Sequence, residues 1–549
     1  MSTARGAFDA ASGRLRRLPT AVLLGAACAL QAAIAITVAL TSTHNHAVWY
    51  SGGDATEYWT SSWMLAHGAL PQTVIGYGVP LLWAWVPPLT GAAMISGLPV
   101  ITLLQALVLV PLCALLVWAI GDLLFGRGFA WWALALWIAG PLLLLWGFDS
   151  SYAPQFRDLF LAPHWYGLTD MADFPSLVVV LAAAWAGLRM LQTRALNDAV
   201  LCGLCTGLLV GIKPANGFFV PAVALLVLAT RSPRTIATWC GALVPALVTL
   251  TVWKQKGRGG VPLLSYSPHK EALGAGEHPV LAVTNRYVHL DWGHFTMELH
   301  DLAGVFWSVR LLEFLAIAGL LGALRRSPLK GAFLGLWAGA FLIVKGSSTL
   351  AGISTLNYYR YVEPGLPAYV LLAASVIFLV PRTGRAFPEP DVPRTWGRAP
   401  LAVATGLLAA IPLVVVVATP AATTVRYVRD NTLGNDAPIS KTLAAHVIAA
   451  GDGIHLTWRA PDASSTKVYY AVYRSSTPST CSLPPEGAVE CDLVMKMIHI
   501  TPGTSFVDTT PTRTNVYRVG MYANYEKAVE NGSDLMLIGP ATPVVRAAR

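Results

Sequence analysis

Long apolar segments recur along most of the chain, separated by stretches rich in polar residues, Gly and Pro. About eleven of them approach the roughly 20 residues that a helix needs to cross a bilayer core of about 30 Å. Helices satisfy their own backbone hydrogen bonds in lipid, so the pattern predicts a polytopic α-helical membrane protein. The predicted spans cover residues 19–41, 98–124, 129–147, 174–190, 197–212, 215–230, 235–253, 302–324, 331–346, 363–381 and 400–419.

Residues 79–97 are also apolar, but we expect them to lie at the membrane interface. Pro87 and Pro88 interrupt a helix there, and Trp83 and Trp85 are residues typical of the interface.

The pattern changes after the last apolar segment, where short stretches of alternating residues replace the long apolar runs. These stretches are 454–458, 468–474 and 516–519, with turn residues between them. The alternation predicts a small β-sandwich over residues 452–549. We therefore divide the chain into a transmembrane domain (1–420), a connector (421–451) and this sandwich.

Composition agrees with a membrane protein. Of the 549 residues, 55% are hydrophobic and 12% charged, and the mean hydropathy is +0.55. A soluble protein of this size carries roughly twice that charged fraction. The basic residues before residue 18 precede an apolar run that is longer than a signal-peptide core and lacks a convincing cleavage site, so we interpret this run as a retained span.

The net charge of +9 follows from membrane topology rather than from nucleic-acid binding. Cations fall in alternate loops, which the positive-inside rule makes cytoplasmic. The N-terminus is then inside, and the C-terminal sandwich and the longer loops are outside, on a cell membrane. The cations that set this orientation are Arg14, Arg16, Arg17, Arg127, Arg189, Arg194, Arg231, Arg234, Arg325, Arg326, Lys330, Arg382, Arg385, Arg394 and Arg398.

Five of the seven cysteines fall within or beside apolar spans, and we interpret them as small core residues, including the CxxC pair Cys202 and Cys205. Cys481 and Cys491 are the pair in the outer domain. In an oxidising compartment they are predicted to form a disulfide.

The first outer loop contains Asp54 and Glu57, which share a face if the segment is helical. One interpretation is that Asp54 only caps the helix that follows, with Glu57 completing a capping box. The other is catalytic, with Tyr58 and Trp59 offering aromatic faces to a sugar or lipid.

The second outer loop concentrates charge next to the hydrocarbon, which is costly unless the groups are hydrated, paired or used. Its candidate functional residues are Arg157, Asp158, His164, Asp170 and Asp173.

Two further cations lie on the predicted outer side, against the charge rule. Lys213 separates two short spans, and its partner is either an anion or the membrane interface. Arg360, beside Tyr361, can fork two hydrogen bonds onto a phosphate; its alternative partner is Glu363 on the same helical face.

No Gly-rich nucleotide motif and no zinc spacing is present in the sequence. Soluble nucleotide sugars are absent outside the cell, so the sequence is consistent with a lipid-linked donor.

In combination, four features resemble the GT-C superfamily of polyprenyl-phosphate-dependent glycosyltransferases, in particular the bacterial protein-O-mannosyltransferase-like and aminoarabinose-transferase-like group. They are Asp54 after the first span, Asp173 with Pro175 opening a later span, a Gly-rich helix ending in Lys213-Pro214, and Arg360-Tyr361 followed by Pro364 and Pro367. The resemblance covers about residues 15–420. The sandwich resembles a fibronectin type III domain through Trp458, Pro461 and the segment 506–510.

This resemblance implies a GT-C fold and transfer of a sugar from polyprenyl phosphate to an acceptor hydroxyl on the outer face, with inversion. Asp54 is then the general base. Arg360, Lys213 and Arg157 neutralise the phosphate, and Tyr58, Trp59, His164 and Tyr361 contact sugar or lipid. Glu57 supports the acidic site with Asp158, Asp170 and Asp173. The acceptor is an envelope glycan, a lipid or a protein.

No cofactor is certain, because the second loop lacks a clear DxD, and a divalent cation remains open. The rival function is a transporter or flippase of a lipid-linked or polar solute. The charges cluster in outer loops rather than at mid-span, and no inverted repeat is evident, which disfavours that class. A non-catalytic scaffold for the sandwich is a third alternative, disfavoured by the four features.

Overall fold

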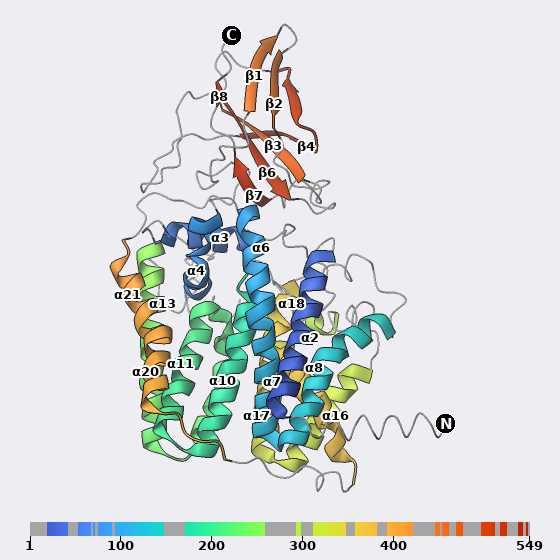
Figure 1. Ribbon diagram of the computed structural model, residues 1–549, viewed down its shortest axis with the longest axis vertical. Coiled ribbons are helices and arrows are strands. Elements are labelled where there is room, and N and C mark those ends of the chain that lie inside the picture. Colours follow the sequence, from blue (N-terminus) through green and yellow to red (C-terminus); the bar gives the residue numbers. More distant parts are fainter. Residues whose placement is uncertain are drawn as a thin grey trace.

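A computed structural model describes the chain over residues 19–41, 53–66, 68, 70–71, 75–90, 94–147, 171–258, 292–297, 311–346, 357–381, 392–420, 445–450, 453–459, 468–475, 496–510, 516–523, 536–541 and 545–546. Up to Ala418 the described elements are helices, and from Ala445 they are strands. The long helices lie side by side, and the strands form a separate unit beyond one end of them (Figure 1).

Helices occupy each of the eleven apolar segments that the sequence singles out. Several contain a short π or 3₁₀ turn between two α-helical parts. The elements are α2 (Thr20–Thr41), α6 (Met94–Leu104), η1 (Gln105–Leu109), α7 (Val110–Phe125), α8 (Arg127–Gly147), α10 (Asp173–Thr193), α11 (Leu196–Ile212), η3 (Pro214–Phe219), α12 (Val220–Ala229), α13 (Pro233–Arg258), α16 (Leu311–Arg326), α17 (Pro328–Ala338), η4 (Gly339–Lys345), α18 (Asn357–Val362), η5 (Glu363–Gly365), α19 (Leu366–Ser375), η6 (Val376–Leu379), α20 (Arg398–Thr405), η8 (Gly406–Ala410) and α21 (Ile411–Ala418).

Within the described residues, six helical stretches are long and apolar enough to cross a membrane. They are Thr20–Thr37, Pro99–Phe125, Asp173–Thr193, Pro233–Lys256, Arg360–Leu379 and Arg398–Ala418, and three shorter apolar helices accompany them. The chain is therefore a largely helical protein with the composition of a membrane protein. The total of eleven crossings stays a prediction.

Three short helices precede α6: α3 (Gly53–Ala66), α4 (Gly78–Trp83) and α5 (Val86–Thr90). The last two lie in the segment predicted to be interfacial, and neither is long enough to span a bilayer.

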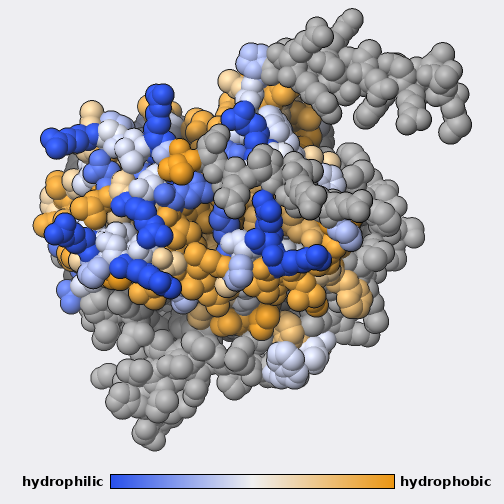
Figure 2. Space-filling view, turned by 90° about the horizontal axis from the view of Figure 1, so that it is seen from below, coloured by the Kyte–Doolittle hydropathy of each residue, from blue (hydrophilic) through white to orange (hydrophobic). Residues whose placement is uncertain are grey.

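Consecutive helices meet tightly at the end opposite the strands. Gly126, between α7 and α8, has a φ of +90°, a conformation that favours glycine. The Lys330 side chain donates to the carbonyl oxygens of Leu123 and Leu124, at 3.0 and 2.5 Å, and so caps α7. Figure 2 looks onto this end and shows long hydrophilic side chains gathered over an apolar surface.

The strands form two antiparallel sheets. β1 (Ala445–Ala450), β2 (Gly453–Trp458) and β5 (Ser505–Asp508) lie in the order β1-β2-β5. β4 (Lys496–Thr501), β3 (Val468–Ser475), β6 (Val516–Ala523) and β7 (Met536–Ala541) form the order β4-β3-β6-β7, with β8 (Val545–Arg546) also pairing with β6. β1 lies within the segment that the sequence predicts as connector.

Alternating residues of both sheets share one core. Leu456 and Trp458 of β2 pack with Val472 of β3 and with Tyr517 and Val519 of β6. This is the core of a small sandwich. At its edge, β7 approaches α3 and α6, so the sandwich lies over the end of the helical part that carries these helices (Figure 1).

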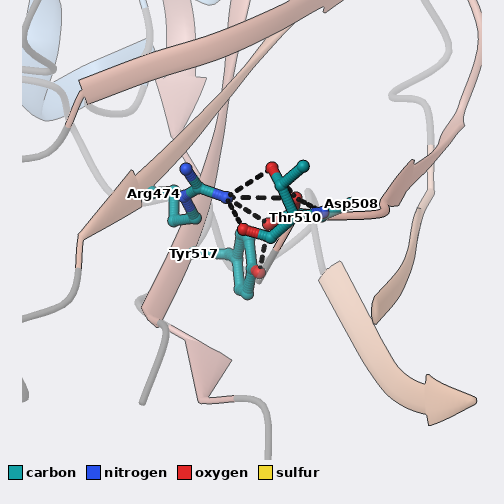
Figure 3. A network of polar contacts seen from close by, with 4 residues as sticks. All are labelled: Arg474, Asp508, Thr510 and Tyr517. Atoms are coloured by element: carbon teal, nitrogen blue, oxygen red, sulfur yellow. Dashed lines mark hydrogen bonds and ion pairs between the residues drawn. The ribbon is translucent and has the colours of Figure 1, made fainter. Parts of the chain in front are cut away.

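A polar network joins the two sheets. The Asp508 carboxylate accepts hydrogen bonds from the Tyr517 hydroxyl at 2.6 Å, from Arg474 Nη1 at 2.9 and 3.1 Å, and from the Thr510 backbone N–H at 3.0 Å (Figure 3). Burial alone would raise the pKa of Asp508, but the hydrogen bonds from Tyr517 and Arg474 outweigh it and hold the pKa below its usual value.

Cys202 and Cys205 are buried free thiols in α11, which agrees with the prediction that they are core residues. Cys481 and Cys491 lie outside the described residues.

Candidate functional site

Three charged side chains from distant parts of the sequence converge between the helices. The Lys213 Nζ donates to Asp173 Oδ1 at 2.7 Å, and the Arg360 Nε lies 3.4 Å from the same oxygen. Lys213 Nζ also donates to the backbone carbonyl oxygen of Arg360 at 3.1 Å. Three of the four sequence features therefore meet in one cluster, which we call the Asp173 cluster.

The local sequence accounts for how Lys213 reaches this position. α11 ends at Ile212, and Lys213 adopts an extended conformation with φ −141° and ψ 103°. The following Pro214 disfavours a helical conformation at Lys213. Beyond it, the Asn216 side chain donates to the Leu209 carbonyl oxygen at 3.2 Å and ties η3 back onto α11.

The cations are the accessible members of the cluster. The Asp173 side chain is 1% exposed, whereas those of Lys213 and Arg360 are 13% and 18% exposed. A buried carboxylate thus holds two partly exposed cations in a fixed arrangement. Such an arrangement suits an anionic ligand that carries several acceptor oxygens, because both cations are already oriented.

Glu363 is the residue that sequence reasoning undervalued. It is 0% exposed, and neither carboxylate oxygen has a hydrogen-bond partner in the part of the chain that the structure describes. The sequence offered it as the alternative partner of Arg360, but the arginine is paired with Asp173 instead. Its helical spacing from Arg360 was visible in the sequence; its burial was not.

Asp173 is also incompletely satisfied. Its second oxygen, Oδ2, has no hydrogen-bond partner among the described residues. Buried polar atoms without partners are uncommon in proteins and are costly. The Asp173 cluster therefore retains acceptor capacity.

The loop that the sequence predicts to be the first outer one is connected to this cluster through α3. Asp54 is the second residue of α3, and Glu57 follows one turn later, so the predicted helix is present. On the same helix, Tyr58 and Trp59 are 5% and 2% exposed. They share a buried apolar cluster with Ala172 and Ile212, the residues immediately before Asp173 and Lys213.

Trp59 is fitted closely against α6. A Cβ added at Gly97 would lie 2.1 Å from the Trp59 ring, so the glycine makes room for the indole. α3 is in this way held at the cluster by its aromatic residues. Their contact with a sugar or lipid stays a prediction.

The chain between α3 and α4 meets the Lys213 segment backbone to backbone. A Cβ at Gly76 would lie 2.3 Å from the Gly211 carbonyl oxygen, and one at Gly78 would lie 2.3 Å from the Ile212 side chain. Glycine is required at both positions for this approach. The segment from α3 to α4 thus packs directly against the residues that position Lys213.

Of the remaining candidate residues, the structure describes Tyr361. Tyr361 lies in α18 and is partly buried. Arg157, Asp158, His164 and Asp170 lie outside the described residues. Over the described ranges, no group of three or more His, Cys, Asp or Glu side chains is arranged to hold a metal ion.

No family model and no curated protein matches the chain. Solved structures with some similarity include the apo oligosaccharyltransferase of Archaeoglobus fulgidus, at 16% identity and a TM-score of 0.38 over 72% of this chain and 56% of that one. Another is the oligosaccharyltransferase AglB of the same organism with an inhibitory peptide and a dolichol-phosphate, at 16% identity and a TM-score of 0.41 over 73% of this chain and 56% of that one. The chain thus spans a little over half of their length. Neither activity nor substrate follows from a likeness this weak.

Proposed function

We propose that this chain is a membrane glycosyltransferase of the GT-C type. It transfers a monosaccharide from a polyprenyl-phosphate donor to an acceptor hydroxyl on the extracytoplasmic face of a cell membrane. The observation that carries the proposal is the convergence of Lys213 and Arg360 on the buried Asp173, together with the packing of the helix that bears Asp54 against the residues preceding that pair.

The two cations are the proposed phosphate site. Cleavage of the sugar–phosphate bond leaves a phosphate that carries the departing electron pair, so the leaving group needs positive charge more than it needs a proton. Lys213 and Arg360 supply that charge, with Asp173 holding them in place. Arg157 is a third proposed cation.

Asp54 is the proposed general base. It accepts the proton of the acceptor hydroxyl while the oxygen attacks the anomeric carbon on the face opposite the phosphate, which inverts the configuration. Base catalysis of this kind contributes about 10² to 10⁴ in rate. Glu57, Asp158 and Asp170 remain proposed to bind the acceptor or a divalent cation.

Orientation follows from the charges. Arginines at helix junctions gather at the end opposite the sandwich, which supports a cytoplasmic position for that end. The N-terminus is then inside, and the sandwich and the Asp173 cluster are outside. The sheet orders β1-β2-β5 and β4-β3-β6-β7 support a fibronectin type III-like assignment for the sandwich.

A transporter or flippase is the rival function. The Asp173 cluster would then bind a lipid phosphate during transit and would need no base. A catalytic role for Asp54 separates the two functions, because a transporter would keep its activity when this carboxylate becomes an amide.

The test is a transfer assay on the full chain in nanodiscs. A panel of polyprenyl-phosphate monosaccharides is supplied with envelope glycan extract, and release of free polyprenyl phosphate is followed for wild type and Asp54→Asn. Arg234→Gln, which removes an exposed charge at the opposite end, is the matched control. We expect release with one donor, loss in Asp54→Asn and no change in the control. Equal release by wild type and Asp54→Asn would show that Asp54 takes no part in the mechanism.

A further inference from the structure

One ionisable side chain beside the Asp173 cluster has no part in the proposed transfer. Glu363 is the first residue of η5 and is completely buried. Neither of its carboxyl oxygens has a hydrogen-bond partner in the part of the chain that the structure describes. It interacts electrostatically with Asp173, Lys213 and Arg360, so it belongs to the same group of charges. Away from water, the protonation of a carboxyl group depends on the charges around it.

The packing of η5 fixes Glu363 in this position. The carbonyl oxygen of the next residue, Pro364, accepts a hydrogen bond from the Trp337 indole N–H at 2.7 Å. A Cβ added at Gly365 would lie 2.8 Å from the Cβ of Phe341, so η5 lies directly against η4. Both aromatic residues are buried. The Glu363 carboxyl group is therefore held beside the cations by a rigid turn.

The net charge of the cluster depends on Glu363. With Asp173 ionised, Lys213 and Arg360 leave the cluster one positive charge when Glu363 is neutral, and no net charge when Glu363 is ionised. A phosphodiester carries one negative charge, so it balances the cluster only in the first case. Bringing a second negative charge close to an ionised Glu363 would cost at least about tenfold in affinity.

We propose that Glu363 controls anion binding at the Asp173 cluster by its charge. The phosphate binds when the Glu363 carboxyl group is neutral, and the ionised carboxylate competes with the phosphate for Lys213 and Arg360. Glu363 is thus a positioning residue, which acts through the two cations. An ionised Glu363 takes up one proton from the solvent as the phosphate binds, and no other reactant is needed. This inference rests on the proposed function, because it takes the ligand to be a polyprenyl-linked phosphodiester.

A thiol provides the matched control. Cys113 in α7 is a second titratable side chain that interacts electrostatically with Glu363. The groups that face Glu363 are thus Asp173 of α10, Lys213 after α11, Arg360 of α18 and Cys113 of α7. Cys113→Ser removes the titratable thiol and nearly keeps the size of the side chain.

The experiment measures how the affinity for a phosphodiester changes with pH. The full chain in phosphatidylcholine nanodiscs is titrated with farnesyl methyl phosphate, whose charge is constant over the range used. We expect the affinity of wild type to fall at least tenfold from about pH 5 to about pH 9. Glu363→Gln, whose amide resembles the neutral carboxyl group, should keep the affinity found at low pH, and Cys113→Ser should follow wild type. Any loss that comes from Lys213 occurs in all three proteins, so the ratio of affinities isolates Glu363.

Proton uptake tests the same coupling on wild type alone. Calorimetric titrations in two buffers of different ionisation enthalpy should show uptake of up to one proton per ligand bound, and none for Glu363→Gln. Parallel pH profiles of wild type and Glu363→Gln, or no proton uptake by wild type, would overturn the inference and leave the proposed phosphate site standing. Loss of the pH dependence in Cys113→Ser would overturn it too, because the thiol would then be the titrating group. If wild type binds the phosphodiester at no pH, the proposed phosphate site fails as well.

Discussion

Asp508 and Asp173 are each paired with an arginine, but their surroundings differ. Asp508, in the sandwich, accepts hydrogen bonds on both carboxylate oxygens from a tyrosine, an arginine and a backbone N–H. Asp173, among the helices, uses one oxygen for two cations, and its other oxygen has no hydrogen-bond partner in the described residues. Glu363, which interacts electrostatically with Asp173, Lys213 and Arg360, has none on either oxygen there.

On the proposed function, this difference separates a network that holds a fold together from one arranged for a ligand. A saturated carboxylate gains stability from each hydrogen bond and has no capacity for another partner. An unsaturated carboxylate among apolar helices costs stability in the free protein, which is why we propose a function for the Asp173 cluster. The predictions below test this comparison.

The largest expected effect is on transfer activity. Lys213→Gln removes a cation from the phosphate site and should lower the transfer rate about 10²- to 10³-fold, the range for losing one electrostatic stabiliser. The rate of polyprenyl phosphate release measures it, with Arg234→Gln as the control. A rate within twofold of wild type would exclude Lys213 from the mechanism.

Disrupting the Asp508 network should have the opposite effect, a loss of stability without a loss of transfer activity. Asp508→Ala removes the acceptor shared by Arg474 and Tyr517 and should destabilise the sandwich by about 2 to 3 kcal/mol. The rate of transfer at a permissive temperature should stay near that of wild type. Hydrogen exchange of the β5 and β6 amides, measured as the temperature is raised, reports the loss of sandwich stability. A loss of transfer activity without a loss of stability would show that the Asp508 network takes part in the transfer reaction.

Glu363→Gln should not destabilise the ligand-free protein, because neither carboxyl oxygen accepts a hydrogen bond from the described residues that the amide would lose. The melting temperature of the purified protein in detergent measures it. A structural role for Glu363 predicts the reverse, a lower melting temperature. Asp508→Asn is a useful contrast, because there the change from a carboxylate to an amide should lower the melting temperature.

Acid should weaken the sandwich through Asp508. Its pKa is lowered in the folded state, so its stabilising contribution is complete above the unfolded pKa and is lost as the pH falls through the lower, folded pKa. The melting temperature of wild type should therefore fall more steeply below about pH 4 than that of Asp508→Asn. Parallel curves would mean that Asp508 carries no pH-dependent stability.

Much of the helical part could be predicted from the sequence, because an apolar segment of sufficient length has few alternatives to a helix in lipid. The positions of Asp173 and Arg360 just before such segments, and of Lys213 between two of them, also indicated a common end of the bundle. Hydropathy could not show that one carboxylate holds both cations, because pairing depends on how helices far apart in sequence pack.

What the sequence could not show has the same physical origin, the packing of segments that are far apart in the chain. Helical spacing offered Glu363 as the alternative partner of Arg360, and tertiary packing placed the arginine against Asp173. Tyr58 and Trp59 were proposed from their residue type to contact a sugar or lipid, which stays a prediction, and the sequence did not show that both are buried in one cluster with Ala172 and Ile212. In the tail, alternation identified β2, β3 and β6, while β1 at Ala445–Ala450 precedes the expected start of the sandwich.

The most direct test of the central claim is a thermal titration of the full chain with polyprenyl phosphate. A ligand that binds only the folded protein stabilises it by about 2.7 kcal/mol at 100 times its Kd. The melting temperature of wild type and of Asp508→Asn should rise with ligand concentration, and that of Lys213→Gln should not. No rise in wild type, or an equal rise in Lys213→Gln, would contradict the assignment of the Asp173 cluster as a lipid phosphate site.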